Sequence, residues 1–398
     1  MTFVHHITAT SALGSGLSAQ LQALRAGQSG LKRCDFESVT LDTWIGEVAG
    51  LDAIALPAAL KAYDCRNHRL ALMGLQADGF EQAARAAINR YGAQRVALIV
   101  GTSTSGILLA EQAYRERHGE GALPDWFDYH KTHNTGALAA FVREYLGVQG
   151  PAYTLSTACS SSAKAFAAAD RLLQLGLVDA AVVGGVDSLC LTTLYGFASL
   201  ELTSHQACRP CDVDRDGLSI GEAAAFALLT RDAQGASGPA LAKLAGWGEA
   251  SDAHHMSAPH PEGRGSRSAM TAALAMAGLA PSAVDYVNLH GTATPANDAS
   301  EGGGVRGLLG GAVPCSSTKG LTGHTLGAAG ALEAVISVLC IQHGLVPGSV
   351  GTHTVDPAIG LNVPLRSYEQ PLAHVLSNSF GFGGSNCSLL FSQLEGAQ

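Results

Sequence analysis

The most informative stretch of the sequence is Pro151-Ala-Tyr-Thr-Leu-Ser-Thr-Ala-Cys-Ser-Ser-Ser-Ala-Lys-Ala-Phe166. Its apolar start, Ala152 to Leu155, predicts a buried strand, and the alanine-rich pattern from Ser160 to about Leu175 predicts a helix. Cys159 lies between the two, at the N-terminal end of the helix. Unpaired backbone N–H groups and the helix dipole favour a thiolate there. A lone buried cysteine is more often structural, so the nucleophile hypothesis depends on what the rest of the chain supplies.

Composition indicates a compact α/β protein. The chain has 398 residues, of which 47% are hydrophobic and 14% charged, and its 48 glycines and long alanine runs let helices and strands approach closely. Such a composition argues against disorder and fits several packed layers of helix and sheet. The net charge of −9 gives no general affinity for nucleic acid.

The sequence also predicts a soluble, cytoplasmic protein. The first residues, Met-Thr-Phe-Val-His-His, lack the charged start and apolar core of a signal peptide. Charged residues interrupt the longest apolar runs, so we expect no membrane contact. The nine cysteines are an odd number scattered through a large chain, which indicates a reducing compartment and no disulfide framework.

The α/β pattern occurs twice. Asp232 to Gly238 is a predicted linker, after which the pattern restarts. A strand from Val284 to Leu289 ends at His290, and Cys315 to Lys319 followed by a helix from Thr325 to Cys340 repeats the strand–turn–helix around Cys159. We therefore predict two α/β halves, residues 1–238 and 239–398, with mostly parallel buried sheets covered by helices.

Three further stretches carry candidate catalytic groups. They are Asn288-Leu-His-Gly-Thr-Ala-Thr-Pro-Ala-Asn-Asp298, Ser317-Thr-Lys-Gly-Leu-Thr-Gly-His-Thr-Leu-Gly-Ala-Ala-Gly-Ala-Leu-Glu333 and Asn378-Ser-Phe-Gly-Phe-Gly-Gly-Ser-Asn386. Each puts polar or aromatic groups at strand ends, where open α/β sheets form their clefts. A single histidine in such a place is more often a hydrogen-bonded core residue. A cysteine, two histidines and a lysine at such junctions together predict an active site.

These four stretches resemble the signatures of the β-ketoacyl-acyl carrier protein synthases, the elongating condensing enzymes of the thiolase superfamily. Two more segments extend the resemblance: Arg209-Pro-Cys-Asp-Val-Asp-Arg-Asp-Gly217, and Ser251-Asp-Ala-His-His-Met-Ser-Ala-Pro-His-Pro261, which resembles the loop at the family's substrate entrance. The resemblance implies a thiolase-like α/β fold with duplicated halves in five layers, α-β-α-β-α. It also implies a dimer, either of like chains or with a related ketosynthase-like subunit.

The resemblance implies a decarboxylative Claisen condensation. Cys159 would take an acyl group from acyl carrier protein, and the N–H groups of Cys159 and Phe382 would bind the oxyanion. A malonyl thioester would then lose carbon dioxide, and His290 and His324, both neutral, would donate hydrogen bonds to the resulting enolate oxygen. Lys319 would polarise the surroundings of the second histidine together with Glu333.

The resemblance assigns further roles around this centre. Thr292 and Thr294 would bind the phosphopantetheine arm, and Phe382 would also act as a gating aromatic beside the cysteine. No metal or redox cofactor is expected, because phosphopantetheine arrives on the carrier protein. Basic residues would dock the acidic carrier, namely Arg66, Arg69 and Arg209. Thr104 would close the far end of the acyl tunnel, where a small polar residue would admit a long or stiff chain.

Several alternatives lack supporting residues. Cys208 and Cys211 form a C-x-x-C, but no second one completes a zinc site. Asp212 to Gly217 resembles a calcium loop whose twelfth position is Ala223 and not glutamate. The spacing of three histidines in one loop fits no common metal motif, and the glycine-rich Gly320 to Gly330 lacks both nucleotide-binding signatures.

Two interpretations of the pathway stay open. In the first, the chain is a condensing enzyme of fatty acid, polyketide or polyene synthesis. In the second, it is the active ketosynthase of a heterodimer with an inactive chain-length-factor-like partner in a polyene pathway. A role as the inactive partner itself is disfavoured, because such chains lose the cysteine and this chain has Cys159.

Overall fold

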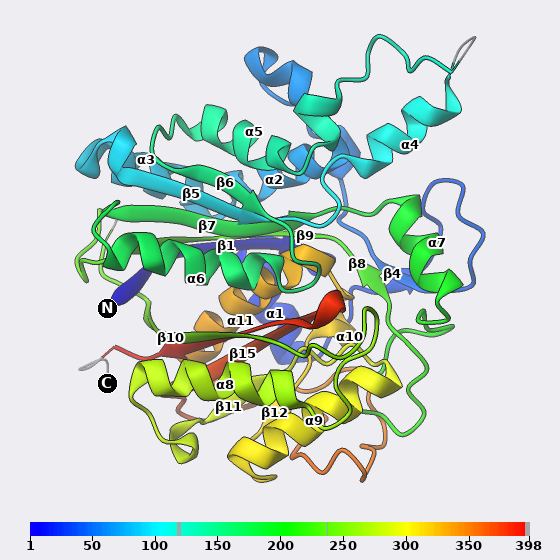
Figure 1. The fold of residues 1–398 in the computed structure, drawn as a ribbon, viewed down its shortest axis with the longest axis vertical. Coiled ribbons are helices and arrows are strands. Elements are labelled where there is room, and N and C mark those ends of the chain that lie inside the picture. The colour runs from blue at the N-terminus through cyan, green and yellow to red at the C-terminus, as the bar shows by residue number, and fades with distance from the viewer. Residues whose placement is uncertain (118–120, 237, 395–398) are drawn as a thin grey trace.

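Two copies of one strand order build the molecule, described here from a computed structural model over residues 1–117, 121–236 and 238–394 (Figure 1). In the first copy the order is β6 (Ala152–Leu155), β5 (Val96–Gly101), β7 (Ala180–Asp187), β9 (Ala223–Thr230) and β1 (Thr2–Ser11). In the second it is β12 (Cys315–Ser316), β11 (Tyr286–Asn288), β15 (His374–Gly381), β16 (Ser385–Ser392) and β10 (Ala242–Ser251). Counted along the chain, each copy runs third, second, fourth, fifth, first.

Strand direction repeats as well. β9 in the first copy and β16 in the second are antiparallel to both of their neighbours, whereas the two pairs nearest the outer edge of each copy are parallel. A short antiparallel pairing, Thr2 to Val4 with Ala242 to Leu244, joins the copies edge to edge. The strand order thus repeats on either side of residues 231–241, the region that contains the predicted linker.

Helices complete five layers, visible from top to bottom in Figure 1. The central layer contains α1 (Leu17–Ala26), α6 (Ser161–Gln174) and α11 (Ala329–His343). The outer layers are α2 (Arg66–Gln76), α3 (Phe80–Tyr91) and α5 (Gly136–Leu146) on one side, and α8 (Arg264–Ala277) and α9 (Pro295–Leu309) on the other. The predicted thiolase-like α/β architecture is confirmed, but the prediction of mostly parallel sheets is wrong. Four of the nine pairings along the strand order are parallel, and five are antiparallel.

Helix α11 is apolar on all sides because it packs against β9 of one copy and β15 of the other. By length and composition alone, Leu326–His343 could also cross a membrane, but 89% of it is buried inside the protein. Core packing therefore accounts for its composition.

The remaining helices and strands are short. They are β2 (Gly14–Ser15), β3 (Lys32–Arg33), β4 (Trp44–Gly46), α4 (Ile107–Arg115), a π-helical turn (Tyr129–His133), α7 (Leu191–Ser199), β8 (Ile220–Gly221), α10 (Lys319–Thr322), β13 (Leu345–Val346) and β14 (Tyr368–Glu369). Single 3₁₀ turns occur at Leu51–Ala53, Ala58–Tyr63, Ala77–Gly79, Ala93–Arg95, Pro281–Ala283, Leu326–Ala328 and Phe382–Gly384.

Candidate active site

Cys159 lies in a tight turn between β6 and α6. The preceding residue, Ala158, has a φ of 53°, in the left-handed region that a non-glycine residue adopts at a cost. The N–H of Thr157 donates to Ser161 Oγ at 2.8 Å, and the N–H of Ser161 donates back to the Ala158 carbonyl at 3.1 Å. This closed turn directs Cys159 into the interior, where it is 5% exposed.

Burial reverses the expected ionisation of Cys159. Desolvation raises the pKa of its thiol to about 12, although the charge of Lys319 and a hydrogen bond from the Phe382 N–H act in the opposite direction. Burial therefore opposes the thiolate that the helix terminus was expected to favour. At neutral pH the nucleophile is a thiol, which needs a proton acceptor when it reacts.

His324 places a ring nitrogen next to the Cys159 thiol. Its Nε2 lies 3.0 Å from Cys159 Sγ, and the ring of His290 stands edge-on to it with the centroids 5.2 Å apart. Burial, followed by the charge of Lys319, holds the pKa of both histidines well below the ordinary value. Both imidazoles are therefore neutral, the state that the resemblance requires.

The backbones of both histidines are fixed from outside the site. His324 is held by β8, since its N–H donates to Ser219 O at 2.7 Å and its carbonyl accepts from the Gly221 N–H at 2.9 Å. The N–H of His290 donates at 2.9 Å to Glu301, a buried carboxylate on α9.

Lys319 brings a positive charge into the protein interior. Its Nζ pairs with the carboxylate of Glu333 on α11, and both side chains are buried. The same Nζ lies 3.5 Å from His290 Nδ1. Lys319 therefore adjoins the first histidine, whereas the resemblance implied the second, and it acts on His324 through its charge. Burial raises the pKa of Glu333 to about 7 in spite of the lysine. The pair therefore places a cation beside the histidines, and the negative charge that balances it lies on α11.

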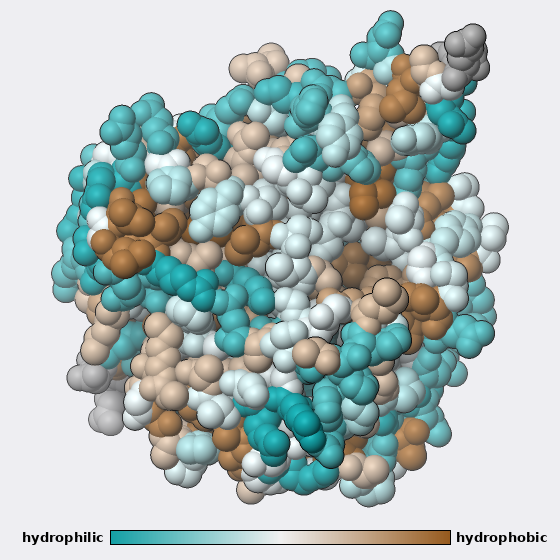
Figure 2. All heavy atoms as spheres, in the orientation of Figure 1, coloured by the Kyte–Doolittle hydropathy of each residue, from teal (hydrophilic) through white to brown (hydrophobic). Residues whose placement is uncertain are grey.

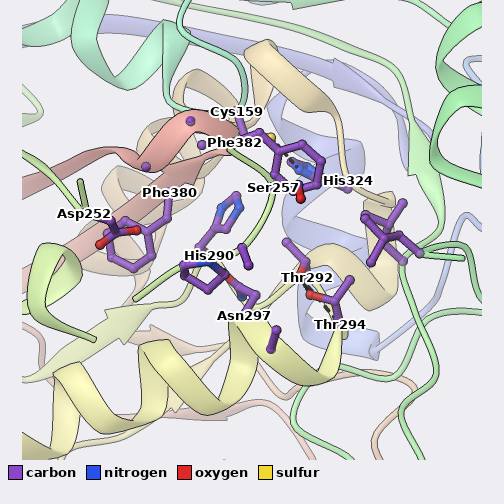
Figure 3. Close-up of a pocket in the computed structure, with 18 of the residues that line it drawn as sticks. Cys159, Asp252, Ser257, His290, Thr292, Thr294, Asn297, His324, Phe380 and Phe382 are labelled. Carbon is purple, nitrogen blue, oxygen red and sulfur yellow. Dashed lines mark hydrogen bonds between the residues drawn. The ribbon is translucent and has the colours of Figure 1, made fainter. Parts of the chain in front are cut away.

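A pocket of about 610 Å³, including its mouth, opens onto these groups (Figure 3). Cys159, His290 and His324 line one end. Thr292 and Thr294 line the side, and their hydroxyls lie 2.9 Å apart. The structure thus brings the predicted cysteine, histidines and threonines into one cavity.

Phe382 borders the same pocket and is partly exposed, at 36%. Its ring centroid lies 5.5 Å from that of Phe197 on α7. Gly381 next to it permits the approach of the strand to the nucleophile, because a Cβ there would lie 2.8 Å from Thr157 O. Phe382 thus stands at the pocket beside the cysteine, as a gating residue requires.

The three arginines predicted to dock the carrier protein form contacts within the protein. Arg66 is 8% exposed and pairs with buried Glu222 at 2.6 Å, so it is not a surface cation and the docking role assigned to it is wrong. Arg209 is mostly buried and donates to the Asp214 carbonyl. Arg69, 30% exposed and paired with Asp64 at 2.6 Å, remains the most accessible of the three.

Thr104 does not line the pocket that contains Cys159. It is buried, and its hydroxyl donates to Asp187 Oδ1 at 2.6 Å. A small polar residue fits this position because its hydroxyl donates a hydrogen bond to the buried Asp187 carboxylate. The sequence pattern could not reveal that contact. Nothing in its position supports the predicted role in chain length.

Other pocket residues were given no role of their own in the sequence analysis, although all but Phe197, Leu202 and Leu218 lie in stretches quoted there. They are Phe197, Leu202, Leu218, Asp252, Ser257, Ala258, Pro259, Ala296, Asn297, Phe380 and Asn386, together with glycines of the Phe382 turn. Asn297 could have been found, since it lies within the stretch quoted around His290. Phe197 gave no signal because helix α7 has the pattern of an ordinary apolar helix.

In the part of the chain that the structure describes, potential metal ligands meet at this centre alone. Sγ of Cys159 and a ring nitrogen of each histidine lie within 4.8 Å of one another. Within the described ranges no other group of three such ligands occurs, so neither Cys208 with Cys211 nor the loop histidines form one.

Comparison with known proteins gives this arrangement a family. Residues 8–235 match the β-ketoacyl synthase N-terminal domain, and residues 241–353 match the β-ketoacyl synthase C-terminal domain. The chain belongs to the β-ketoacyl synthase family. It is a condensing acyltransferase.

Individual relatives support the assignment of this synthase. The 3-oxoacyl-[acyl-carrier-protein] synthase 2 of Coxiella burnetii is 33% identical over 96% of each chain. The mitochondrial 3-oxoacyl-[acyl-carrier-protein] synthase of Arabidopsis thaliana is 39% identical, but the match spans 62% of the synthase and 58% of that relative. A solved ketosynthase from Xenorhabdus doucetiae, in complex with its chain length factor, is 38% identical, with a TM-score of 0.89 over 99% of the synthase and 98% of that chain.

Proposed function

We propose that the synthase joins an acyl group held on Cys159 to a malonyl unit carried by acyl carrier protein, with loss of carbon dioxide. The observation that carries this proposal is the 3.0 Å contact between Cys159 Sγ and His324 Nε2, with neutral His290 and the Lys319 charge behind it. We include acyl carrier protein in this proposal because the relatives are named 3-oxoacyl-[acyl-carrier-protein] synthases.

Acyl transfer comes first. Cys159 Sγ attacks the thioester carbonyl carbon, and the N–H groups of Cys159 and Phe382 stabilise the oxyanion. The thiol proton passes by way of His324 Nε2 to the departing phosphopantetheine sulfur. The products are the acyl-enzyme and a free carrier thiol. Because the pKa of Cys159 is raised, this proton leaves as the C–S bond forms and not in the resting enzyme.

Decarboxylation follows in the same pocket. The C–C bond to the malonyl carboxylate breaks, carbon dioxide leaves, and the electron pair forms an enolate on the thioester oxygen. His290 and His324 stabilise that oxygen by donating N–H hydrogen bonds, which neutral rings can do without losing a proton. For His324 this requires that its proton move from Nδ1 to Nε2 after acyl transfer, because Nε2 accepts the thiol proton in the first step. The Lys319 charge adds electrostatic stabilisation.

Carbon–carbon bond formation completes the cycle. The enolate carbon attacks the acyl carbonyl, the C–S bond breaks, and Cys159 leaves as a thiolate that takes a proton from solvent water. Thr292 and Thr294 are well placed to hold the carrier's arm during acyl transfer and again during condensation, since they line the pocket. We propose that the reaction needs no metal or redox cofactor, because the thioester already activates the carbonyl.

A second proposal concerns the partner: the synthase is the active ketosynthase of a heterodimer with a chain-length-factor-like subunit. Strand β6 supports it, because among the described residues it pairs only with β5 and leaves Tyr153 37% exposed at the edge. Exposed aromatic residues also lie on and after the neighbouring helix α4, which extends away from the layers in Figure 1: Tyr114, Trp126 and Tyr129. The space-filling view in Figure 2 shows apolar side chains gathered on that projecting segment. The similar Xenorhabdus ketosynthase was solved with such a partner.

The compartment and pathway are part of the same proposal. All nine cysteines are free, which is compatible with the reducing cytoplasm. We propose polyketide or polyene synthesis over fatty acid synthesis because of the partner described for the Xenorhabdus ketosynthase.

Intact mass spectrometry with acyl carrier protein tests the chemistry. The wild type should gain one acyl group on Cys159, and Cys159→Ala should gain none. His290→Ala should still acylate, whereas His324→Ala, which lacks the acceptor of the thiol proton, should acylate more slowly but not be inactive. Both variants should release carbon dioxide from malonyl carrier protein at least about a hundredfold more slowly than wild type. Near wild-type condensation by Cys159→Ala would refute the proposal.

A further inference from the structure

A buried carboxylate that the mechanism does not use lies close to the nucleophile. Asp187 is the last residue of β7, fully buried. Its Oδ1 accepts hydrogen bonds from both hydroxyl and backbone donors of the turn that follows β5: Thr102 Oγ1 at 2.7 Å, Ser103 N at 2.8 Å, Thr104 N at 2.7 Å and Thr104 Oγ1 at 2.6 Å. One oxygen therefore fixes three consecutive residues.

The turn held in this way reaches the residue before Cys159. Ser103 Oγ donates to the Ala158 carbonyl at 3.2 Å. Ala158 is the residue with the left-handed backbone that directs Cys159 into the pocket. Since such a conformation persists only where its surroundings hold it, the Ser103 bond is one of the contacts that keep the sulfur in place.

A segment from the second half of the chain packs against Asp187 and this turn. A Cβ on Gly327 would lie 2.7 Å from Asp187 Oδ2 and 2.7 Å from Ser103 Oγ, so that glycine packs directly on the carboxylate and the turn. Gly327 follows His324 by three residues. Asp187 thus adjoins both the segment that carries the nucleophile and the segment that carries its histidine.

We propose that Asp187 is a positioning residue of the condensing reaction: by holding the Thr102–Thr104 turn against Ala158, it sets Cys159 Sγ at the distance from His324 Nε2 that acyl transfer requires. This inference rests on the proposed function. Misplacement of a reacting atom by about 1 Å costs on the order of a hundredfold in rate, so a residue outside the pocket can control the reaction.

Two variants separate positioning from general stability. Asp187→Ala removes every acceptor, whereas Asp187→Asn keeps an amide oxygen in the place of Oδ1. We expect Asp187→Ala to lower kcat for acylation by at least about tenfold with KM within about twofold, and Asp187→Asn to recover most of that loss. A loss confined to KM, or an Asp187→Asn variant as impaired as Asp187→Ala, would overturn the proposal.

Asp170 provides the matched control. It is also buried and accepts hydrogen bonds from Thr2 Oγ1 at 2.5 Å and Trp247 Nε1 at 2.9 Å, but it does not contact the turn. Asp170→Ala should lower the unfolding midpoint without changing kcat for acylation. A kcat loss equal to that of Asp187→Ala would assign the effect to general destabilisation and refute positioning.

A variant with a smaller change covers the case in which Asp187→Ala does not fold. Ser103→Ala deletes only the bond to Ala158 and should lower kcat by about three- to tenfold. Alkylation of Cys159 by iodoacetamide, followed by peptide mass spectrometry, reports the position of the sulfur without any carrier substrate. Altered alkylation in Ser103→Ala, with near wild-type alkylation in Asp187→Asn, supports positioning even if the proposed substrate is wrong. Unchanged alkylation and kcat in Ser103→Ala overturn it.

Discussion

At the scale of single residues, burial and not the helix terminus sets the chemistry of Cys159. Its raised pKa of about 12 leaves very little thiolate at pH 7. We predict that the rate of Cys159 alkylation by iodoacetamide rises about tenfold per pH unit from about pH 7 to 9, because the thiolate fraction does so below the pKa. Peptide mass spectrometry at each pH measures the rate. A plateau near pH 7 would mean that the thiol ionises there.

Lys319 acts on the histidines through its charge. Burial is the larger cause of the low pKa of both histidines, and the charge of Lys319 is the next. The wild-type rings therefore stay neutral from pH 8 to 6. Protonation of the histidines should then not change the rate of malonyl decarboxylation over this range. In Lys319→Met/Glu333→Gln, where both charges are removed, the pKa of each histidine rises. We predict that decarboxylation by this variant falls relative to wild type as the pH decreases toward 6, measured by carbon dioxide release.

The double variant is preferable to Lys319→Met alone, because the single change leaves the Glu333 carboxylate buried without a partner. Glu333→Gln is the control for the lost hydrogen bond. Identical pH profiles for wild type and the double variant would show that the Lys319 charge does not keep the histidines neutral.

At the scale of elements, α2 illustrates what a sequence can and cannot specify. Arg66 and Arg69 are three residues apart and both were expected to be surface cations, yet Arg66 faces inward toward Glu222 and only Arg69 is partly exposed. Helical periodicity predicts which residues share a face. Which charges find buried partners depends on Glu222, a residue 156 positions away.

We predict that Arg66→Met lowers the free energy of unfolding by about 3–5 kcal/mol, since it leaves Glu222 buried and unpaired. Arg69→Met should cost about 0–1 kcal/mol, because its pair with Asp64 is partly solvated. Urea unfolding measures both. Equal stabilities of the two variants would contradict the structural role of Arg66, and a raised carrier KM in Arg69→Met alone would retain that residue for docking.

Local patterns located the catalytic elements well, although the strand before Cys159, predicted to be buried, is the partly exposed edge strand β6. Helix α6 begins one residue after the predicted Ser160, and β11 lies within the predicted strand that ends before His290. These elements follow from periodicity and from small residues at strand ends. The environment of Thr104 did not follow, because it depends on a contact with Asp187, 83 positions away. The ionisation of Cys159 did not follow either, because it depends on burial and on the charge of Lys319 from the opposite half of the molecule.

At the scale of the whole molecule, the site exists only where the two copies meet. Cys159 comes from the first, whereas His290, Lys319 and His324 come from the second, and α11 packs against strands of both. We predict that the copies unfold together, so that urea transitions followed by tryptophan fluorescence and by Cys159 alkylation coincide. Separate transitions would show that each copy is stable alone.

The repeated strand order has a consequence for protein engineering. Residues 231–241 connect two units of the same topology, so this connection is a suitable crossover point for chimaeras between related synthases. A chimaera would inherit its acyl-accepting sulfur from one parent and its decarboxylating histidines from the other. Acyl choice and extender chemistry could then be recombined as separate modules within one polypeptide.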